Sequence, residues 1–318
     1  QPPKRIHSMH TQVRDLDFDT PPVLSAAVTE GRAWRMLQEH KEISALPVAN
    51  EDGTLYGMLS REDVASYNMA LVTLGVLEKV PLFNVLSVLE GKVLNEAGEN
   101  TDTIEGEIAI ALPQSRENLL FNRKKSIVFC GHQPDMIQRA LEMNVNCLVL
   151  CQAEISEEQR NIPTTTCVIS TPFDAYRAAR LIFQSTPIGR ICRTKDLVCF
   201  HLEDRVDDVK ELVLKHREHC YPILDENERV VGVLTRYHLL RPRRKRVVLV
   251  DHNEASQSVP GLEEAEILEI IDHHRLADIQ TNNPIYVRNE PVGSTNTIIA
   301  SMFQDRGLMP SEKMAGMM

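Results

Sequence analysis

Two short apolar segments near the C-terminal end of the sequence each lead into an acid followed by an imidazole. Residues 247–250 run into Asp251-His252, and residues 270–271 run into Asp272-His273-His274. Val- and Ile-rich runs are typical of buried strands, and open α/β folds place their sites at the carboxyl ends of parallel strands. Carboxylate oxygens and neutral imidazole nitrogens suit Mn²⁺, Mg²⁺ or Zn²⁺. The pattern predicts a metal site that handles phosphate; the alternative is two solvated acidic loops.

Composition indicates a globular protein of more than one domain. The 318 residues are 42% hydrophobic and 25% charged, and this length predicts two or three domains. The net charge of -10 provides no overall basic field, so neither nucleic acid nor a membrane is expected as a partner. The basic run at residues 241–246 is interpreted as a charged linker.

Cysteine usage and the chain ends give two further expectations. The seven cysteines form no CxxC pair and several lie in apolar runs, which is typical of a reduced compartment. No stretch has the length and apolar character of a membrane span, and a cytoplasmic location is predicted. The sequence begins with Gln1, and residues 311–318 start a helix-capping pattern without a terminator. We therefore expect an internal piece of a longer protein.

One pattern occurs twice at matched spacing. Residues 46–60 hold a proline in an apolar run, a glycine ten residues later and a serine three residues after that; residues 221–235 repeat this order and end in threonine. Each copy reads as helix, strand, turn, strand and helix, which indicates one module used twice. The copies resemble a CBS domain, a small β-α-β-β-α unit that pairs with a second copy. The resemblance gives CBS modules at residues 13–78 and 191–245.

CBS pairs often bind adenine nucleotides between the two copies, and the resemblance implies candidates at each strand-to-helix turn. A hydroxyl and a carboxylate there can hold phosphate and ribose at a helix N-terminus. In the second copy a histidine stands where the family often has Asp, with an arginine and a tyrosine beside it to pair with phosphate and stack on adenine. The alternative for each hydroxyl is plain helix capping. The candidates are Ser60, Asp63, Thr235, Arg236, Tyr237 and His238.

Residues 79–190, between the two copies, alternate continuous apolar strands with helical stretches. This pattern predicts a small parallel sheet covered on both faces. The motifs at residues 131–138 (GHQPDMIQ) and 170–174 (STPFD) make the segment similar to a DRTGG domain. The first motif also looks like a metal site, but its single carboxylate cannot bridge two ions, and Pro134 suits a helix start.

The segment from residue 246 to 318 carries the most specific resemblance. Residues 248–254 (VLVDHNE), 270–276 (IIDHHRL) and 291–295 (PVGST) resemble a family II inorganic pyrophosphatase, a manganese-dependent member of the DHH phosphoesterases. With the other modules, the chain is similar to the regulated form, in which CBS and DRTGG domains are inserted into the catalytic domain. The expected fold class is α/β: two CBS modules flanking a small α/β DRTGG domain, followed by part of a parallel-sheet DHH domain. Residues 1–12 are expected to be a linker.

The resemblance implies a role for each acid and imidazole. Asp251 would bridge two metal ions and His273 would bind one, with Mn²⁺ expected and Mg²⁺ or Co²⁺ as alternatives. His274 would be the acid beside the leaving phosphate. His252 and Asp272 would orient the ligands through hydrogen bonds.

A helix start at residues 293–295 adds two candidates for phosphate contact, Ser294 and Thr295. Plain capping is the alternative.

Two features depart from the family pattern. The family's opening His and paired Asp have no match before Val13, because His7 and His10 lack acids at the needed spacing, and a further Asp ligand is expected after Met318. Two metal ligands do not hold a dinuclear cluster. We therefore expect no turnover from the chain by itself.

The first hypothesis for function is hydrolysis of inorganic pyrophosphate to two phosphates at a dinuclear metal site. AMP, ADP, ATP or a dinucleotide would regulate it. The alternatives are a non-catalytic nucleotide sensor, and a DHH enzyme that acts on a phosphodiester or on polyphosphate. A homodimer is expected, because CBS pairs commonly associate with another pair.

Overall fold

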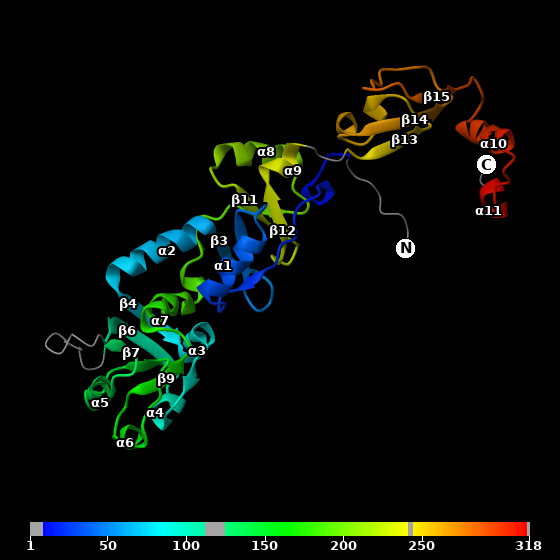
Figure 1. Ribbon diagram of the computed structural model, residues 1–318. Coiled ribbons are helices and arrows are strands. Elements are labelled where there is room, and N and C mark those ends of the chain that lie inside the picture. The colour runs from blue at the N-terminus through cyan, green and yellow to red at the C-terminus, as the bar shows by residue number, and fades with distance from the viewer. Residues whose placement is uncertain (1–8, 112–124, 241–243, 317–318) are drawn as a thin grey trace. The chain divides into compact units, whose positions relative to one another are not determined.

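The computed structural model describes residues 9–111, 125–240 and 244–316 (Figure 1). It divides into two compact units. The C-terminal unit comprises Gln1–Asp19, Phe200–His219 and Leu234–Met318, and the central unit comprises Thr20–Cys199 and Cys220–Val233. The division passes through the segment assigned to the second CBS module, and the predicted domain boundaries stay predictions. Most of the predicted linker, including His7, and residues 241–243 of the basic run lie outside the described residues.

The central unit contains a six-stranded sheet. Its order is β4 (Val76–Pro81), β6 (Thr103–Ile110), β7 (Ser126–Cys130), β8 (Cys147–Cys151), β9 (Cys167–Thr171) and β5 (Lys92–Val93). The four middle strands are parallel, and the edge strands β4 and β5 are antiparallel to their neighbours. Every residue of β7 and β8 is buried, as expected for strands covered on both faces.

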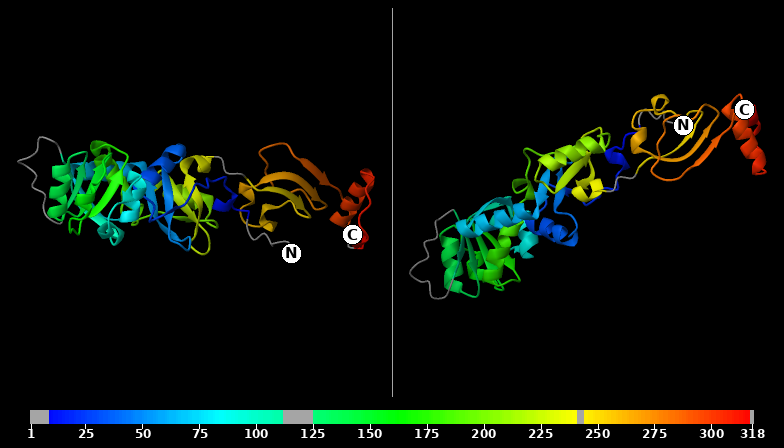
Figure 2. Two further views of the ribbon diagram at one scale, coloured as in Figure 1. Left: turned by 60° about the horizontal axis from the view of Figure 1, so that its bottom comes forward. Right: turned by 90° about the horizontal axis from the view of Figure 1, so that it is seen from above.

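Helices cover both faces of this sheet. The helices α3 (Leu82–Leu89) and α7 (Ala175–Leu181) pack on one face and α5 (Pro134–Glu142) on the other, in the cyan-to-green part of Figure 2. α5 begins with the proline that the sequence placed at a helix start, and Asp174 caps α7 by accepting from the backbone N–H of Arg177 at 2.9 Å. The remaining helices of this region are α4 (Glu96–Glu99), α6 (Glu157–Arg160), and the 3₁₀ turns η2 (Ile182–Ser185) and η3 (Ile188–Arg190).

The first copy of the repeated pattern also lies in the central unit. It consists of β1 (Leu24–Ser25), α1 (Glu30–Glu39), β2 (Ala45–Ala49), β3 (Leu55–Ser60) and α2 (Arg61–Leu74). Its hairpin contacts that of the second copy, formed by β11 (Cys220–Leu224) and β12 (Val230–Thr235): the backbone N–H of Val230 donates to the carbonyl of Gly53 at 3.1 Å. Met58 and Val233 share one buried cluster. The two copies therefore meet through matched hairpins.

The C-terminal unit carries the other elements of the second copy, the short turn η1 (Val13–Asp15) and a separate parallel sheet. The elements of the second copy are β10 (Phe200–His201), α8 (Val206–Lys215) and α9 (Arg236–Leu240). The sheet has the order β13 (Arg246–Val250), β14 (Glu266–Asp272) and β15 (Tyr286–Asn289). Val250 pairs with Ile271, and Asp272 pairs with Asn289, so the loops after all three strands leave the same edge. The short turns η4 (Ala255–Gln257) and η5 (Leu262–Glu264) connect β13 to β14, and α10 (Thr295–Asp305) and α11 (Glu312–Ala315) follow β15.

Glu264, the last residue of η5 and two positions before the start of β14, joins three parts of the C-terminal unit. It accepts from the backbone N–H of Thr11 at 2.8 Å, contacts the His10 ring at 2.6 Å and lies 3.5 Å from the Arg205 guanidinium. Burial alone would raise the pKa of Glu264, but these hydrogen bonds and the charge of Arg205 hold it below its usual value. The N-terminal segment and the residue before α8 are thus attached to the start of β14.

Within the described ranges, no helix has both the length and the apolar character needed to cross a membrane.

The glycine of the first copy, Gly57, sits where another segment crosses closely. A Cβ atom there would lie 2.6 Å from the carbonyl oxygen of Arg193, whose backbone exchanges two hydrogen bonds with Met58 at 2.9 Å each. A side chain at Gly57 would therefore separate these two segments. Gly131 offers a contrast in the same unit, because its nearest atom to a new Cβ is 3.9 Å away.

We predict that Gly57→Ala lowers the free energy of unfolding of the central unit by about 1–3 kcal/mol, the usual cost of overpacking. Gly131→Ala is the matched control and is expected to stay within about 0.5 kcal/mol of the wild type. Urea unfolding followed by circular dichroism measures both. Equal effects of the two substitutions would contradict the close approach at Gly57.

Candidate functional site

The parallel register of β13 and β14 brings the two acid-imidazole motifs together. Asp251 follows β13 and donates its backbone N–H to the carbonyl of Ile271 at 3.0 Å. Its φ of 69° lies in the left-handed region, which aspartate tolerates better than most residues. This turn places the Asp251 carboxylate beside the residues that follow β14.

His273 is oriented by a backbone carbonyl. Its Nδ1 lies 3.0 Å from the carbonyl oxygen of Val292, so Nδ1 carries the proton and donates it. Nε2 is left with its lone pair, 3.5 Å from Oδ1 of Asp251. Two ligands of one ion, each bound at the usual distance, lie about 3–3.5 Å apart. The pair thus has the spacing of two metal ligands.

Asp251, His273 and His274 form a group that could hold a metal ion. One ligand atom from each lies within 4.8 Å of the others. This donor set of one carboxylate and two imidazoles fits Mn²⁺, Co²⁺ or Zn²⁺. A second group, formed by His10, Glu263 and Glu264, meets the same distance criterion, but the Arg205 guanidinium beside His10 and Glu264 opposes a cation there.

Asp272 is fully buried and holds His274. Its Oδ1 accepts from Nδ1 of His274 at 2.7 Å and from the backbone N–H groups of His273 at 2.8 Å and His274 at 3.3 Å. Burial alone would raise the pKa of Asp272, but these bonds, together with one from Asn253, lower it. The group stays a carboxylate that fixes the imidazole of His274 by its Nδ1–H.

Asn253 is a positioning residue that the sequence did not single out. Its buried side-chain amide donates to Oδ2 of Asp272 and, at 2.9 Å, to the carbonyl of Arg275, while its Oδ1 accepts from the backbone N–H of Ala277 at 2.7 Å. It therefore connects the loop after β13 to the loop after β14. The only sequence signal was its place inside the motif at residues 248–254.

The two helix-start candidates differ in what they contact. Ser294 caps α10 by accepting from the backbone N–H of Asn296 at 3.2 Å. Thr295 is buried, and its hydroxyl donates to Oδ1 of Asp251 at 2.6 Å. Within the described residues Thr295 thus supports Asp251, and its predicted contact with phosphate stays a prediction.

His252 makes no hydrogen bond to the predicted metal ligands among the described residues. Its Nδ1 lies 3.2 Å from the carbonyl oxygen of Val250, and its Nε2 is buried without a partner in the described part of the chain. None of its hydrogen bonds reaches Asp251 or His273, which it was expected to orient.

A cavity of about 390 Å³ lies beside the metal-ligand group. His274 lines it together with Arg275, whose side chain is 86% exposed and lies 3.2 Å from Glu254. Arg275 directly follows the two histidines in the sequence, but the motif by itself predicts no role for it. It supplies a cation next to the imidazole predicted to act as an acid.

The nucleotide candidates of the first copy bond to each other. The backbone N–H and the hydroxyl of Ser60 donate to Oδ2 of Asp63 at 2.8 and 2.7 Å, and the backbone N–H of Asp63 donates back to the Ser60 hydroxyl at 3.1 Å. This is a reciprocal helix cap in which Oδ1 of Asp63 has no described partner.

The second copy makes the same clamp with an imidazole. Nδ1 of His238 accepts from the backbone N–H of Thr235 at 3.0 Å and lies 3.1 Å from its hydroxyl. Because Nδ1 accepts, the ring proton sits on Nε2, which faces Asp19 at 3.4 Å. The His238 ring thus takes the position that the Asp63 carboxylate has in the first copy.

Arg236 is occupied by the protein backbone. Its guanidinium donates to the carbonyls of Val213 and His216, at the end of α8. Arg61 does the same for the end of α1 in the first copy, through the carbonyls of Ile43, Leu37 and His40. The arginine expected to pair with phosphate is thus engaged as a helix cap, whereas Tyr237 is 71% exposed and free to stack.

Comparison with models of protein families shows to which family the chain belongs. The model of the DHH family, N-terminal domain, matches residues 126–318. The chain belongs to the DHH family. A CBS domain model matches residues 13–70 of this DHH chain.

Similar proteins agree with that assignment. A cobalt-dependent inorganic pyrophosphatase of Clostridium perfringens is 37% identical over 99% of the chain, and a probable manganese-dependent inorganic pyrophosphatase of Thermotoga maritima is 31% identical over 100%. The chain spans 58% of the length of each. The solved CBS and DRTGG domains of the regulatory region of a C. perfringens pyrophosphatase, complexed with the activator diadenosine tetraphosphate, match 71% of this chain and 99% of theirs. Sequence identity there is 28% and the TM-score 0.61.

Two expectations are confirmed by these findings. The resemblance to metal-dependent pyrophosphatases with a CBS and DRTGG region holds, and so does the α/β fold class.

We predict that Thr295→Val weakens Mn²⁺ binding by about tenfold or more, because Asp251 loses the hydroxyl that orients it. Thr295→Ser keeps the hydroxyl and is expected to bind within about threefold of the wild type. Titration calorimetry with Mn²⁺ measures both variants. Equal affinity of the Val and Ser variants would show that the hydroxyl does not support the metal ligand.

Proposed function

We propose that this DHH chain carries part of a catalytic centre that hydrolyses inorganic pyrophosphate to two phosphates and is regulated by adenine nucleotides. The observation that carries the proposal is the placement of the Asp251 carboxylate 3.5 Å from Nε2 of His273, beside His274, whose ring is held by the buried Asp272. The pyrophosphatases named above, each similar to the chain over nearly its whole length, supply the substrate class.

The proposed metal site is dinuclear and takes Mn²⁺, with Co²⁺ or Mg²⁺ as alternatives. Asp251 is suited to bridge, because Oδ1 faces His273 and Oδ2 has no partner among the described residues. His273 presents Nε2, with Nδ1 held by Val292. A divalent ion bound here would act as a Lewis acid toward phosphoryl oxygens and make water a stronger nucleophile.

His274 is the proposed proton donor to the leaving phosphate. This role requires a proton on Nε2 of His274, and the buried Asp272 carboxylate holds the ring by accepting from its Nδ1. Arg275 lines the same cavity and would balance negative charge on the substrate. Asn253 keeps both loops at the spacing that this transfer needs.

Nucleotide regulation is proposed at the two repeated turns. The relative of known structure binds diadenosine tetraphosphate in its regulatory region, and the present chain repeats the turn geometry in both copies. Oδ1 of Asp63 is available to ribose hydroxyls, and Tyr237 offers an exposed ring for stacking. A nucleotide changes catalysis only through unequal affinity for the active and inactive arrangements.

We predict that His274→Asn lowers kcat for pyrophosphate by about 100-fold or more while Mn²⁺ affinity stays within about threefold, because the proton donor is lost and the bridging ligand remains. Asp251→Asn is the contrasting variant and should lower Mn²⁺ affinity itself. Mn²⁺ binding is measured on the chain itself, and phosphate release on the longer protein of which the chain is expected to be a piece.

Three outcomes would redirect the proposal. Turnover of polyphosphate or a phosphodiester in preference to pyrophosphate would assign another DHH substrate. Mn²⁺ binding that is unaffected by Asp251→Asn would remove the metal centre. Nucleotide binding without any Mn²⁺ binding would favour a sensor.

A homodimer is proposed through the helices of the second copy. The exposed leucines on α8 and α9 are Leu212, Leu214 and Leu240. Large apolar side chains exposed on two helices in contact are typical of an interaction surface, and a second copy of the chain supplies the same surface.

We predict that Leu214→Glu weakens self-association by about tenfold or more, because it buries a charge in an apolar interface. Met309→Glu, at a side chain 91% exposed in the same unit, is the control and should leave association unchanged. Sedimentation velocity over a range of concentrations measures both. A wild-type chain that stays monomeric throughout would contradict the dimer.

A further inference from the structure

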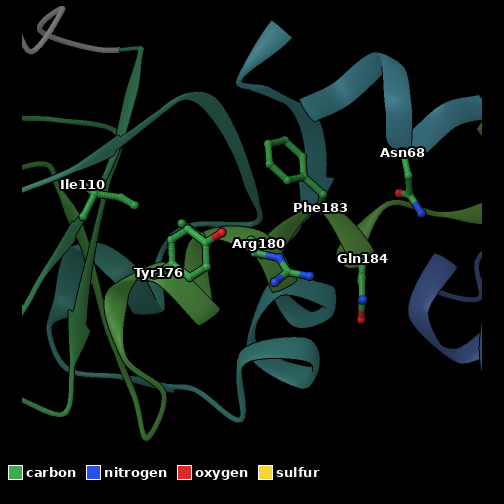
Figure 3. A pocket seen from close by; sticks show the side chains of 7 residues that line it. Asn68, Ile110, Tyr176, Arg180, Phe183 and Gln184 are labelled. Atoms are coloured by element: carbon green, nitrogen blue, oxygen red, sulfur yellow. The ribbon is translucent and has the colours of Figure 1, made fainter. Parts of the chain in front are cut away.

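A cavity of about 490 Å³ lies in the central unit, and none of its lining residues is a candidate of the metal centre or of the nucleotide turns (Figure 3). Tyr176 and Arg180 reach it from α7, Phe183 and Gln184 from η2, Asn68 from α2 and Ile110 from the end of β6. Its volume is in the range of small-molecule sites.

Aromatic and aliphatic groups form its walls. Tyr176 is 67% exposed although its ring is large and apolar, and Phe183 and Ile110 are half-buried. Such walls accept a planar ring by stacking.

Arg180 brings a positive charge that no acid neutralises. Its guanidinium lies 5.8 Å from the centre of the Tyr176 ring, and in the described part of the chain no carboxylate pairs with it. A cation left open beside aromatic rings favours a ligand that is both planar and anionic.

The side-chain amides of Asn68 and Gln184 provide directional hydrogen-bonding groups in the cavity. The Nδ2 of Asn68 donates to Glu30 at 3.1 Å, and Glu30 is 1% exposed, so the amide is fixed from behind. Its carbonyl oxygen is left as an acceptor, and the Gln184 amide has no hydrogen-bond partner among the described residues. The Asn68 carbonyl oxygen can accept from an exocyclic amine, and the Gln184 amide can bond a ring nitrogen of the same heterocycle.

We propose that this cavity, formed by Tyr176, Arg180, Phe183, Asn68 and Gln184, is a nucleotide-binding site separate from the repeated turns. The base stacks between Tyr176 and Phe183, the exocyclic amine donates to Asn68, and the phosphate pairs with Arg180. The site depends neither on pyrophosphate hydrolysis nor on the metal centre.

The experiment is photolabelling of the full chain with azidoadenosine monophosphate, followed by proteolysis and mass spectrometry. We expect label on the peptide that contains Tyr176 and Phe183, and AMP should compete it away. Arg180→Gln should raise the half-saturating concentration by about tenfold or more, as expected for a lost charge-assisted bond.

Arg139→Gln is the matched control, because Arg139 is an exposed arginine on α5 that does not line the cavity. It should label like the wild type, and thermal unfolding shows that both variants are folded. Labels on peptides with Ser60 or Tyr237 report separately on the repeated turns. Absence of label from the Tyr176 peptide, or label there that Arg180→Gln leaves unchanged, would overturn the proposal.

Discussion

The hydrogen bonds of the buried Asp272 carboxylate determine the geometry of the metal centre. A buried anion without partners costs several kcal/mol, so each of its donors is held in place. Those donors are the Asn253 amide, the ring of His274 and the two backbone N–H groups that follow. Because Asn253 comes from the loop after β13, satisfying one carboxylate fixes two loops at once. The spacing of Asp251, His273 and His274 is a consequence of that requirement.

The two CBS copies show how a repeated sequence keeps geometry while its charge changes. Arg61 and Arg236 both satisfy the last carbonyls of the preceding helix, which would otherwise lack partners. Asp63 and His238 both accept from the residue three positions earlier. The first turn therefore carries its carboxylate in the clamp itself, whereas in the second turn an imidazole takes that place and the Asp19 carboxylate lies 3.4 Å behind it.

Sequence reasoning predicted what depends on local pattern. Apolar runs ending in acid and imidazole indicated strand ends, and parallel pairing then required those ends to share an edge. What it missed depends on contacts between distant residues. Thr295 lies 44 positions from Asp251, and a hydroxyl at a helix start reads as a cap until the strand register brings it to a carboxylate. Arg236 was predicted to pair with phosphate from its neighbours in the sequence. In the structure its guanidinium donates to the carbonyls of Val213 and His216. His252 was expected to orient the ligands because it shares a motif with Asp251, and spacing alone could not show that its hydrogen bond goes to Val250 instead.

Glu264 gives the C-terminal unit a route from the second CBS copy to the metal centre. The Glu264 carboxylate contacts Arg205, directly before α8, and the backbone of Thr11 in the N-terminal segment. Glu264 itself stands two positions before the start of β14. That strand ends at Asp272, about 20 Å further along at the usual rise per residue. A strand paired on both sides does not stretch, so a shift at its start is carried to its end or resisted as a whole. A nucleotide that changed the contacts of Arg205 would therefore act on the carboxylate that positions His274, provided that it favoured one arrangement of Glu264 over another.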